Sequence, residues 1–299
     1  MSISQILEEE IKKSVPTEEC AILLSGGVDS LSVAFAAERL GKKITAYSFK
    51  IKDIPSYDYE FAKTLCERNK LYTDNWKFVG IEIDLANFEE RFIELVLLGC
   101  VKKTHFECVF PFLYVYPQIK EKYVLSGWAA DGYFGVSKKA NIHYKHTKEK
   151  DLSDEVRKRK NKELFDQFRD DYFQPENQAG YLWHKKVSDM YNKVFVTPYL
   201  SNPVKEFFYQ YDWEELNKPK QKHHIREAFI EFSHMPKPAK PHMNLQIGSG
   251  ITKEFERLVL PNKDLNVYGK PRIMDVCRDW HEKVLPLKNN KIVKRWLNV

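Results

Sequence analysis

The segment spanning residues 21–31, AILLSGGVDSL, constrains the fold of this chain more than any other stretch. An apolar run leads straight into a glycine pair with serines and an acid around it, and a helical pattern follows. The backbone N–H groups of Ser25, Gly26 and Gly27 can approach an anion closely, and the N-terminus of the following helix adds the positive end of its dipole. The sequence therefore predicts a strand, a phosphate-binding turn and a helix in direct succession.

The acid in this turn, Asp29, indicates a metal ion as well as a phosphate. A carboxylate beside a phosphate is electrostatically favourable only when a hard cation bridges the two groups. We therefore expect Asp29 to bind Mg²⁺. An ordinary surface turn with a helix N-cap is the alternative, because serine and aspartate are common there. The turn fits neither the G-x-x-x-x-G-K-S/T loop nor the G-x-G-x-x-G fingerprint.

Apolar runs with helical patterns between them indicate repeated βαβ units. The runs cover residues 21–24, 44–49, 78–83 and 123–126. Parallel strands need crossover helices and cover on both faces, so residues 1–145 are predicted to form a doubly wound α/β lobe. Ligands of such sheets bind at the carboxyl ends of the strands. The acids that follow the first and the last run, Asp29 and Asp131, should therefore meet in one crevice.

The remainder of the chain has a different character. Residues 146–178 are strongly charged and predict an insertion that is either a solvated helix or a mobile loop; its basic run at 157–160 is more simply a solvated face than a polyanion-binding surface. Helical periodicity returns at 179–208, and residues 179–299 are expected to be mostly helical. Within them, residues 235–250 are rich in proline and glycine, which favours an ordered loop of the kind that carries function.

Composition restricts the compartment and the partners. No apolar run approaches the roughly 20 residues that a membrane span needs, and the first 15 residues lack the apolar core of a secretory signal, so we expect a cytoplasmic protein without a membrane partner. A net charge of +6 and a pI near 8.8 suit phosphorylated or acidic ligands. Without a C-x-x-C pair, the cysteines are expected to be reduced core thiols: Cys20, Cys66, Cys100, Cys108 and Cys277.

Four blocks of sequence resemble one enzyme family. The SGGVDS turn resembles the SGGxDS signature of PP-loop enzymes, which cleave ATP between its α- and β-phosphates. Residues 126–137, SGWAADGYFGVS, resemble the SGEGSDELFGGY block of asparagine synthetase, and residues 222–229, KHHIREAF, resemble its KHILREAF segment. Lys240 and the glycines of residues 248–250 resemble, with two residues inserted, a K-x-x-F-x-x-G-x-G loop that carries a catalytic lysine.

These blocks point to the synthetase domain shared by asparagine synthetase and β-lactam synthetase. Ser2 follows Met1 where the glutamine-using enzymes have a nucleophilic cysteine, so we expect no glutaminase domain. The resemblance implies that ATP adenylates a small-molecule carboxylate, with AMP and pyrophosphate as products, and that ammonia or an amine then attacks the acyl carbon.

The resemblance also implies the roles of individual residues. Asp29 and Asp131 would bind Mg²⁺, while Lys240, Lys222 and Asp131 would serve the chemistry. The residues expected to bind the nucleotide are Ser25, Gly26, Gly27, Asp29, Ser30, Ser48 and Gly127.

Three departures from the family pattern concern the acceptor. Trp128 stands where relatives carry a glutamate or tyrosine, and an indole N–H cannot act as a base. Trp128 would either stack against an aromatic or nucleobase-like substrate or fill the pocket floor. Gly132 replaces the acid after Asp131, and Ser201 replaces the acid of a PFLD segment.

These losses keep other functions open. A PP-loop enzyme that adenylates a nucleobase carbonyl in RNA or DNA is the first alternative, and it would make nucleic acid a partner. Sulfur transfer through Cys100 and Cys108 is a variant of it. A non-catalytic nucleotide-binding relative is the second alternative, because a fold alone does not imply an activity.

Overall fold

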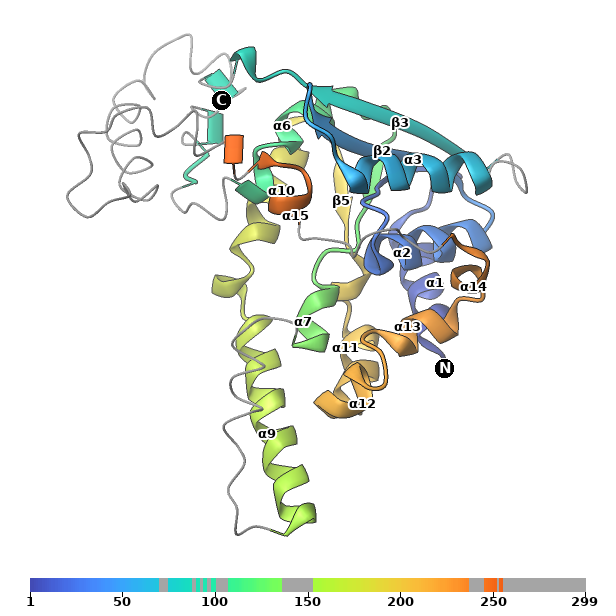
Figure 1. Ribbon diagram of the computed structural model, residues 1–299, viewed down its shortest axis with the longest axis vertical. Coiled ribbons are helices and arrows are strands. Elements are labelled where there is room, and N and C mark those ends of the chain that lie inside the picture. The colour runs from blue at the N-terminus through green and yellow to red at the C-terminus, as the bar shows by residue number, and fades with distance from the viewer. Residues whose placement is uncertain are drawn as a thin grey trace, which may run out of the picture.

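A parallel β-sheet forms the centre of the molecule. The computed structural model describes residues 1–69, 75–87, 90–91, 94–95, 98–100, 107–135, 153–236, 245–251 and 253–254. Within these residues the sheet has five strands in the order β3-β2-β1-β4-β5, and every neighbouring pair is parallel (Figure 1). The strands are β1 (Glu19–Leu23), β2 (Lys43–Ile51), β3 (Trp76–Ile83), β4 (Tyr123–Leu125) and β5 (Val194–Val196). The predicted doubly wound α/β fold is confirmed.

The strand order reverses direction between β1 and β4. β2 and β3 extend the sheet on one side of β1, and β4 and β5 extend it on the other, with Ala21 opposite Val124 and Ile22 opposite Leu125. The connections that leave the carboxyl ends of β1 and β4 therefore diverge, and in open α/β sheets the crevice for a ligand lies at such a switch point. The turns that carry Asp29 and Asp131 follow these two strands.

Successive side chains along each strand point to opposite faces of the sheet, and a cluster of buried residues lies on each face. Cys20 and Ile22 of β1 point to one cluster of buried residues, and Ala21 between them belongs to a second. The first cluster is covered by α1 (Ile3–Ser14), α2 (Val28–Arg39) and α3 (Tyr57–Asn69). The second is covered by α6 (Phe112–Val115) and α10 (Ala179–Met190). Both faces are buried, as a parallel sheet requires.

Shorter elements complete the described part of the chain. The helices that follow β4 are α7 (Ala130–Phe134), α9 (Asp154–Tyr172), α11 (Asn202–Tyr209), α12 (Trp213–Asn217), α13 (His223–Ala228), α14 (Glu231–His234) and α15 (Leu245–Gly248). Short 3-10 helices are η1 (Leu85–Asn87), η2 (Tyr116–Gln118), η3 (Pro175–Asn177) and η4 (Pro198–Leu200). None of the described helices combines the length and the apolar character that a membrane crossing requires.

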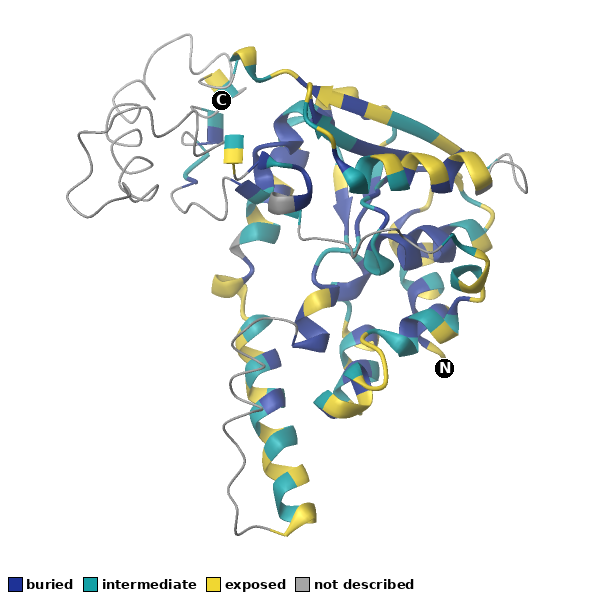
Figure 2. Cartoon of the chain, viewed as in Figure 1, coloured by how far each residue is buried: buried dark blue, intermediate teal, exposed yellow. Residues whose placement is uncertain are grey.

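Within the charged insertion, residues 146–152 lie outside the described residues, and Asp154–Tyr172 form the helix α9, which extends away from the sheet (Figure 1). Most of its surface is exposed or half-buried, and only Phe165 and Arg169 are buried (Figure 2). Arg169 donates hydrogen bonds to the carbonyl oxygens of Phe208 (2.8 Å) and Tyr211 (3.3 Å). These bonds fix the base of α9 to the end of α11.

Two expectations about the second half of the chain were wrong in part. Residues 194–196 were expected to be helical, but they form β5 and add a strand to the sheet, because β-branched Val194 and Val196 suit a sheet edge. Residues 245–248 of the expected loop form the short helix α15. The first core cluster draws residues from both sides of the predicted boundaries at 145 and 178; those boundaries stay a prediction.

Candidate active site

The SGGVDS turn joins β1 to α2 and is braced by its own serines. The hydroxyl groups of Ser25 and Ser30 lie 3.2 Å apart, the Gly27 amide donates to Ser25 Oγ (3.3 Å), and Ser30 Oγ donates to the Gly27 carbonyl (3.1 Å). Gly26 has a φ of +77°, which side chains rarely tolerate, and a Cβ there would lie 2.7 Å from the Phe61 ring. Gly27 is the N-cap of α2. The predicted strand, turn and helix are confirmed.

Asp29 and Asp131 meet at one cation, the side chain of Lys222. Lys222 Nζ lies 2.6 Å from Asp29 Oδ2 and also forms an ion pair with Asp131 Oδ1. The Lys222 side chain is only 13% exposed, whereas that of Asp131 is 62% exposed. The crevice between the ends of β1 and β4 thus brings together three of the predicted site residues, which come from distant parts of the sequence.

Lys222 is held as a charged group. Burial lowers its pKa, but the charges of Asp29 and Asp131 and their hydrogen bonds outweigh burial and raise the pKa above its ordinary value. One helical turn further on, Arg226 is half-buried; burial lowers the pKa of its guanidinium, and the charge of Asp29 acts in the opposite direction. Lys222 thus pairs directly with both acids, whereas Arg226 is linked to Asp29 only through the effect of its charge.

Gly127 allows the two turns to touch. A Cβ at this position would lie 2.6 Å from both the carbonyl oxygen of Asp29 and the amide nitrogen of Ser30, which are backbone atoms that cannot move aside. The turn after β4 therefore packs directly on the first turn of α2. This close approach brings Gly127 beside the predicted phosphate-binding turn.

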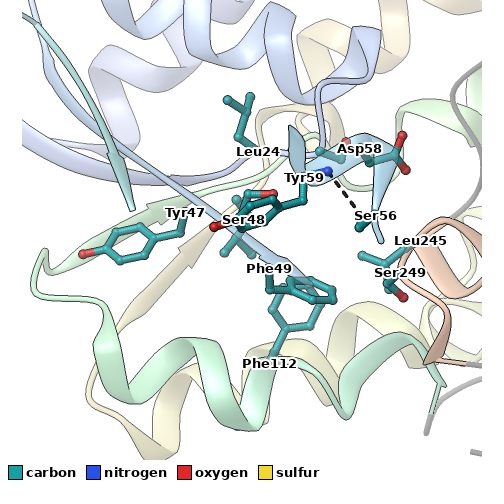
Figure 3. A pocket seen from close by; sticks show the side chains of 12 residues that line it. Leu24, Tyr47, Ser48, Phe49, Ser56, Asp58, Tyr59, Phe112, Leu245 and Ser249 are labelled. Carbon is teal, nitrogen blue, oxygen red and sulfur yellow. Dashed lines mark hydrogen bonds between the residues drawn. The ribbon is translucent and has the colours of Figure 1, made fainter. Parts of the chain in front are cut away.

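A pocket opens beside this turn at the ends of β1 and β2 (Figure 3). It encloses about 460 Å³ of space, part of which is open to solvent. Ser25 and the buried Ser48 line it, and Ser249 and Leu245 close another side. Ser56 Oγ donates to the Gly248 carbonyl (3.2 Å) and so fixes α15 to the loop before α3. The pocket lies beside the SGGVDS turn, where a nucleoside would continue from a bound phosphate.

Trp128 packs into the protein on the other side of the crevice. A Cβ on Gly180 of α10 would lie 2.7 Å from the indole ring, and the half-buried Trp128 side chain packs against the first core cluster. The Trp128 Nε1 atom is buried and has no hydrogen-bond partner among the described residues. This geometry favours the pocket-filling interpretation of Trp128 over a stacking platform for a substrate.

His184 of α10 lies next to Trp128 in an apolar environment. Its ring stacks on Phe195 of β5 at 4.2 Å and lies 4.1 Å from the ring of Phe112. Neither ring nitrogen has a hydrogen-bond partner within the described part of the chain. Burial lowers the pKa of His184 to about 3, so the imidazole is neutral at physiological pH. No sequence pattern distinguishes this histidine from an ordinary helix residue.

Tyr172, at the end of α9, is a site residue that the sequence reasoning missed. A Cβ on Gly132 would collide with the Tyr172 ring, so the loss of a side chain at 132 makes room for the tyrosine. Burial raises the pKa of Tyr172 to about 12, and the charges of Asp131 and Asp29 add to this effect. The phenol therefore stays protonated near the acids. The glycine at position 132, where relatives carry an acid, was the sequence signal that could have indicated a side chain packed closely against this position.

Other predicted residues lie outside this cluster. Lys240 and Cys277 fall outside the described residues. Cys100 is buried and Cys108 is half-buried. The Ser201 hydroxyl is buried and has no hydrogen-bond partner among the described residues.

Comparisons with known proteins identify the family of the chain. A family model described as asparagine synthase matches residues 3–236. No curated protein matches the chain significantly. Among solved structures, the U34-tRNA thiolase NcsA from Methanococcus maripaludis, solved with its 4Fe-4S cluster, is similar over 94% of this chain and 79% of that chain. The sequence identity is 12% and the TM-score is 0.39, so this likeness carries no argument about the reaction.

Proposed function

This chain belongs to the asparagine synthase family, and from that membership we propose that it adenylates a substrate carboxylate with ATP and couples the acyl group to ammonia or an amine. The family consists of ATP pyrophosphatase-type enzymes, so ATP cleavage to AMP and pyrophosphate is the chemistry common to its members. The carboxylate and the nitrogen nucleophile are the specific part of the proposal.

One observation carries the proposal. Asp29 and Asp131, which follow different strands, converge on a single cation beside a phosphate-binding turn. Two carboxylates that share one cation form a donor set that suits Mg²⁺, which often binds through one or two carboxylates and substrate phosphates. When bound there, Mg²⁺ would neutralise negative charge on the phosphates of ATP. A non-catalytic nucleotide-binding relative would not require both acids.

Different residues of the crevice would serve different parts of the first step, the adenylation of the carboxylate. The amides of Ser25, Gly26 and Gly27, with the N-terminus of α2, would bind the phosphates, and the pocket lined by Ser48 would bind the nucleoside. A carboxylate oxygen of the substrate attacks the α-phosphorus, and the bond from that phosphorus to the bridging oxygen breaks. The electron pair leaves with pyrophosphate, whose charge Lys222 would neutralise, with Arg226 close by.

In the second step the amine nitrogen attacks the acyl carbon, and AMP leaves with the electron pair of the broken C–O bond. The resemblance assigns oxyanion stabilisation to Lys240. The amine must lose a proton, and Trp128 has no basic atom to accept it. Tyr172 stays protonated and would act only as a hydrogen-bond donor. The proton therefore goes to another group or to water.

Two observations favour a small carboxylate over a nucleic acid acceptor. The half-buried indole of Trp128 packs closely against Gly180, which favours a pocket-filling role over stacking on a base. The basic run of α9 is paired with acids: Arg157 with Asp154 (3.0 Å), Lys158 with Asp212 and Glu215 (3.5 Å each), and Arg159 with Glu163 (3.8 Å). Paired charges give a weaker field for phosphate groups than unpaired ones.

Isotope transfer tests this proposal. The protein is incubated with Mg²⁺, ATP and a panel of ¹⁸O-labelled carboxylates, each with ammonia or an amine, and the nucleotide product is analysed by mass spectrometry. We expect AMP that carries one ¹⁸O atom from the carboxylate, with pyrophosphate as the second product. Formation of ADP and orthophosphate would contradict the proposal, and unlabelled AMP with RNA as the acceptor would support the nucleobase alternative.

A further inference from the structure

Lys222 lies at the point where a metal ion would have to bind. Its ammonium nitrogen contacts one oxygen of Asp29 and one of Asp131, the two carboxylates that the proposed function assigns to Mg²⁺. The contact with Asp29 is 2.6 Å long, and Mg²⁺ binds oxygen at about 2.0–2.1 Å. A cation of either kind can thus bridge the same pair after a small movement of the carboxylates.

The two cations cannot occupy this position together. An ammonium group and a divalent ion between the same two oxygens would lie closer to each other than either tolerates without an intervening anion. Metal entry therefore requires that Lys222 leaves at least one carboxylate. The Lys222 side chain is 13% exposed, so its ammonium is largely shielded from solvent in its present position.

The backbone of Lys222 indicates that its present position is held by these contacts. Lys222 has φ 60° and ψ 26°, a left-handed conformation that residues with a side chain adopt rarely. Its side chain does not cap α13 by a hydrogen bond. Unusual backbone conformations persist only where surrounding interactions maintain them, and they often occur at elements that switch. The ring of Phe134 lies 5.5 Å from the ammonium and forms one wall of its position.

We propose that Lys222 is an internal counter-ion that competes with the metal for Asp29 and Asp131 and moves to pyrophosphate oxygens when metal-bound nucleotide enters. This inference rests on the proposed function for the identity of the nucleotide. Its consequence is coupling between two ligands. Metal alone must displace Lys222 without offering it a new partner and binds weakly, whereas metal with pyrophosphate supplies an anion for the displaced ammonium and binds tightly.

Mn²⁺ binding measured by electron paramagnetic resonance tests the competition directly, because Mn²⁺ takes the same oxygen ligands as Mg²⁺. The full-length chain is titrated with Mn²⁺ alone and again with inorganic pyrophosphate present. We expect Lys222→Met to bind Mn²⁺ alone at least tenfold more tightly than the wild type, and pyrophosphate to raise the Mn²⁺ affinity of the wild type by a larger factor than that of the variant. Equal or weaker Mn²⁺ binding by Lys222→Met would overturn the proposal.

Lys218→Met is the matched control. It removes the same charge four residues earlier, where Lys218 is exposed and pairs with Glu214 at 2.7 Å. Its Mn²⁺ affinity should equal that of the wild type. A tenfold gain in this variant as well would overturn the proposal, because it would indicate a general effect of net charge.

A measurement on the wild type keeps the inference testable if Lys222→Met does not fold. Lysine reactivity is followed by reductive methylation and mass spectrometry, with and without saturating Mn²⁺. We expect labelling of Lys222 to rise severalfold with Mn²⁺ while labelling of Lys218 is unchanged. Unchanged labelling of Lys222 with Mn²⁺ bound would overturn the proposal. Neither measurement contains ATP or an acceptor, so failure of the isotope experiment and failure of this inference are distinguishable.

Discussion

The proposed nucleotide half and the proposed acceptor half of the crevice are held in place by different kinds of contact. In the nucleotide half, Ser25 and Ser30 brace one turn through hydrogen bonds that span at most five residues of sequence. In the acceptor half, Gly132 is covered by Tyr172, and Trp128 packs on Gly180, so each contact joins elements some 40 to 50 residues apart. A short motif can specify the first half, whereas only the assembled fold specifies the second.

The largest expected effect comes from the nucleotide half. Asp29→Ala should reduce pyrophosphate release by at least about 100-fold, because it removes the charged group that we propose to bind the metal and position the phosphates. Groups of this kind contribute roughly 3–4 kcal/mol. The measurement is pyrophosphate release with whichever carboxylate and amine support turnover. Asp84→Ala, which removes an exposed acid paired with Lys52, is the control and should leave turnover unchanged. Retained release in Asp29→Ala would remove the main support for the proposed function.

Gly127→Ala should disturb both halves, because Gly127 is the point where they touch. The added Cβ would lie against the backbone of Asp29 and Ser30, and overpacking of this kind costs about 3 kcal/mol. We expect a lower free energy of unfolding in denaturant and weaker calorimetric binding of a non-hydrolysable ATP analogue. Gly41→Ala is the control: nothing lies within 4 Å of its Cβ, so only the strain of its φ of +73°, about 1 kcal/mol, should appear. A Gly127→Ala protein as stable as Gly41→Ala would show that the turns can separate.

His184→Phe should change the pH dependence of stability and leave the nucleotide half intact. Burial lowers the pKa of His184 to about 3 from 6.5, so the folded protein keeps the imidazole neutral while the unfolded chain takes up a proton. The contribution of the neutral His184 to the free energy of unfolding is therefore fully present above pH 6.5 and is lost as the pH falls toward 3. Between pH 7 and pH 5 the wild type should lose roughly 2 kcal/mol more than the variant.

Denaturant unfolding at the two pH values checks this expectation, with His234→Phe, at an exposed position on α14, as the control that keeps the wild-type pH dependence. Binding of the ATP analogue should be the same in His184→Phe and the wild type. A pH dependence equal to that of the wild type would mean that His184 has a polar partner in solution.

The smallest expected effect belongs to Ser48→Ala. Ser48 lines the pocket beside the turn, and loss of one neutral hydrogen bond to a ligand contributes about 1 kcal/mol. We expect the affinity for the ATP analogue to fall by a few-fold without a change in stability. Thr64→Ala, on the exposed face of α3, should leave the affinity unchanged. If Ser48→Ala equals Thr64→Ala, the pocket of Figure 3 does not contact the nucleoside through this hydroxyl.

The sequence predicted the parts of the molecule that depend on local pattern. The apolar runs at β1 to β4 indicated the strands because parallel strands are buried on both faces and read as continuous apolar stretches. The turn could also be predicted from local pattern, because its geometry follows from a glycine pair between a strand and a helix. β5 was missed because three residues with helical patterns on either side carry too little periodicity to be recognised.

The acceptor half could not be predicted, because its residues acquire their environment from neighbours that are distant in sequence. Tyr172 ends a charged helix and gives no local signal, and His184 lies in a helix of ordinary composition. Lys222 was identified only through the resemblance of residues 222–229, and nothing in that segment showed that its ammonium would bridge Asp29 and Asp131. Ion pairs between residues so far apart in the sequence form only when the fold brings these residues together.

Helix α2 has a consequence beyond the crevice. It begins at the SGGVDS turn, and its last residue, Arg39, forms a two-point ion pair with Glu231 of α14 (2.7 Å for each bond). The helix therefore links the proposed anion site to the segment that follows α13. Amide exchange at Glu231–His234 would then report occupancy of the proposed site from the opposite end of α2, without any label placed near the chemistry.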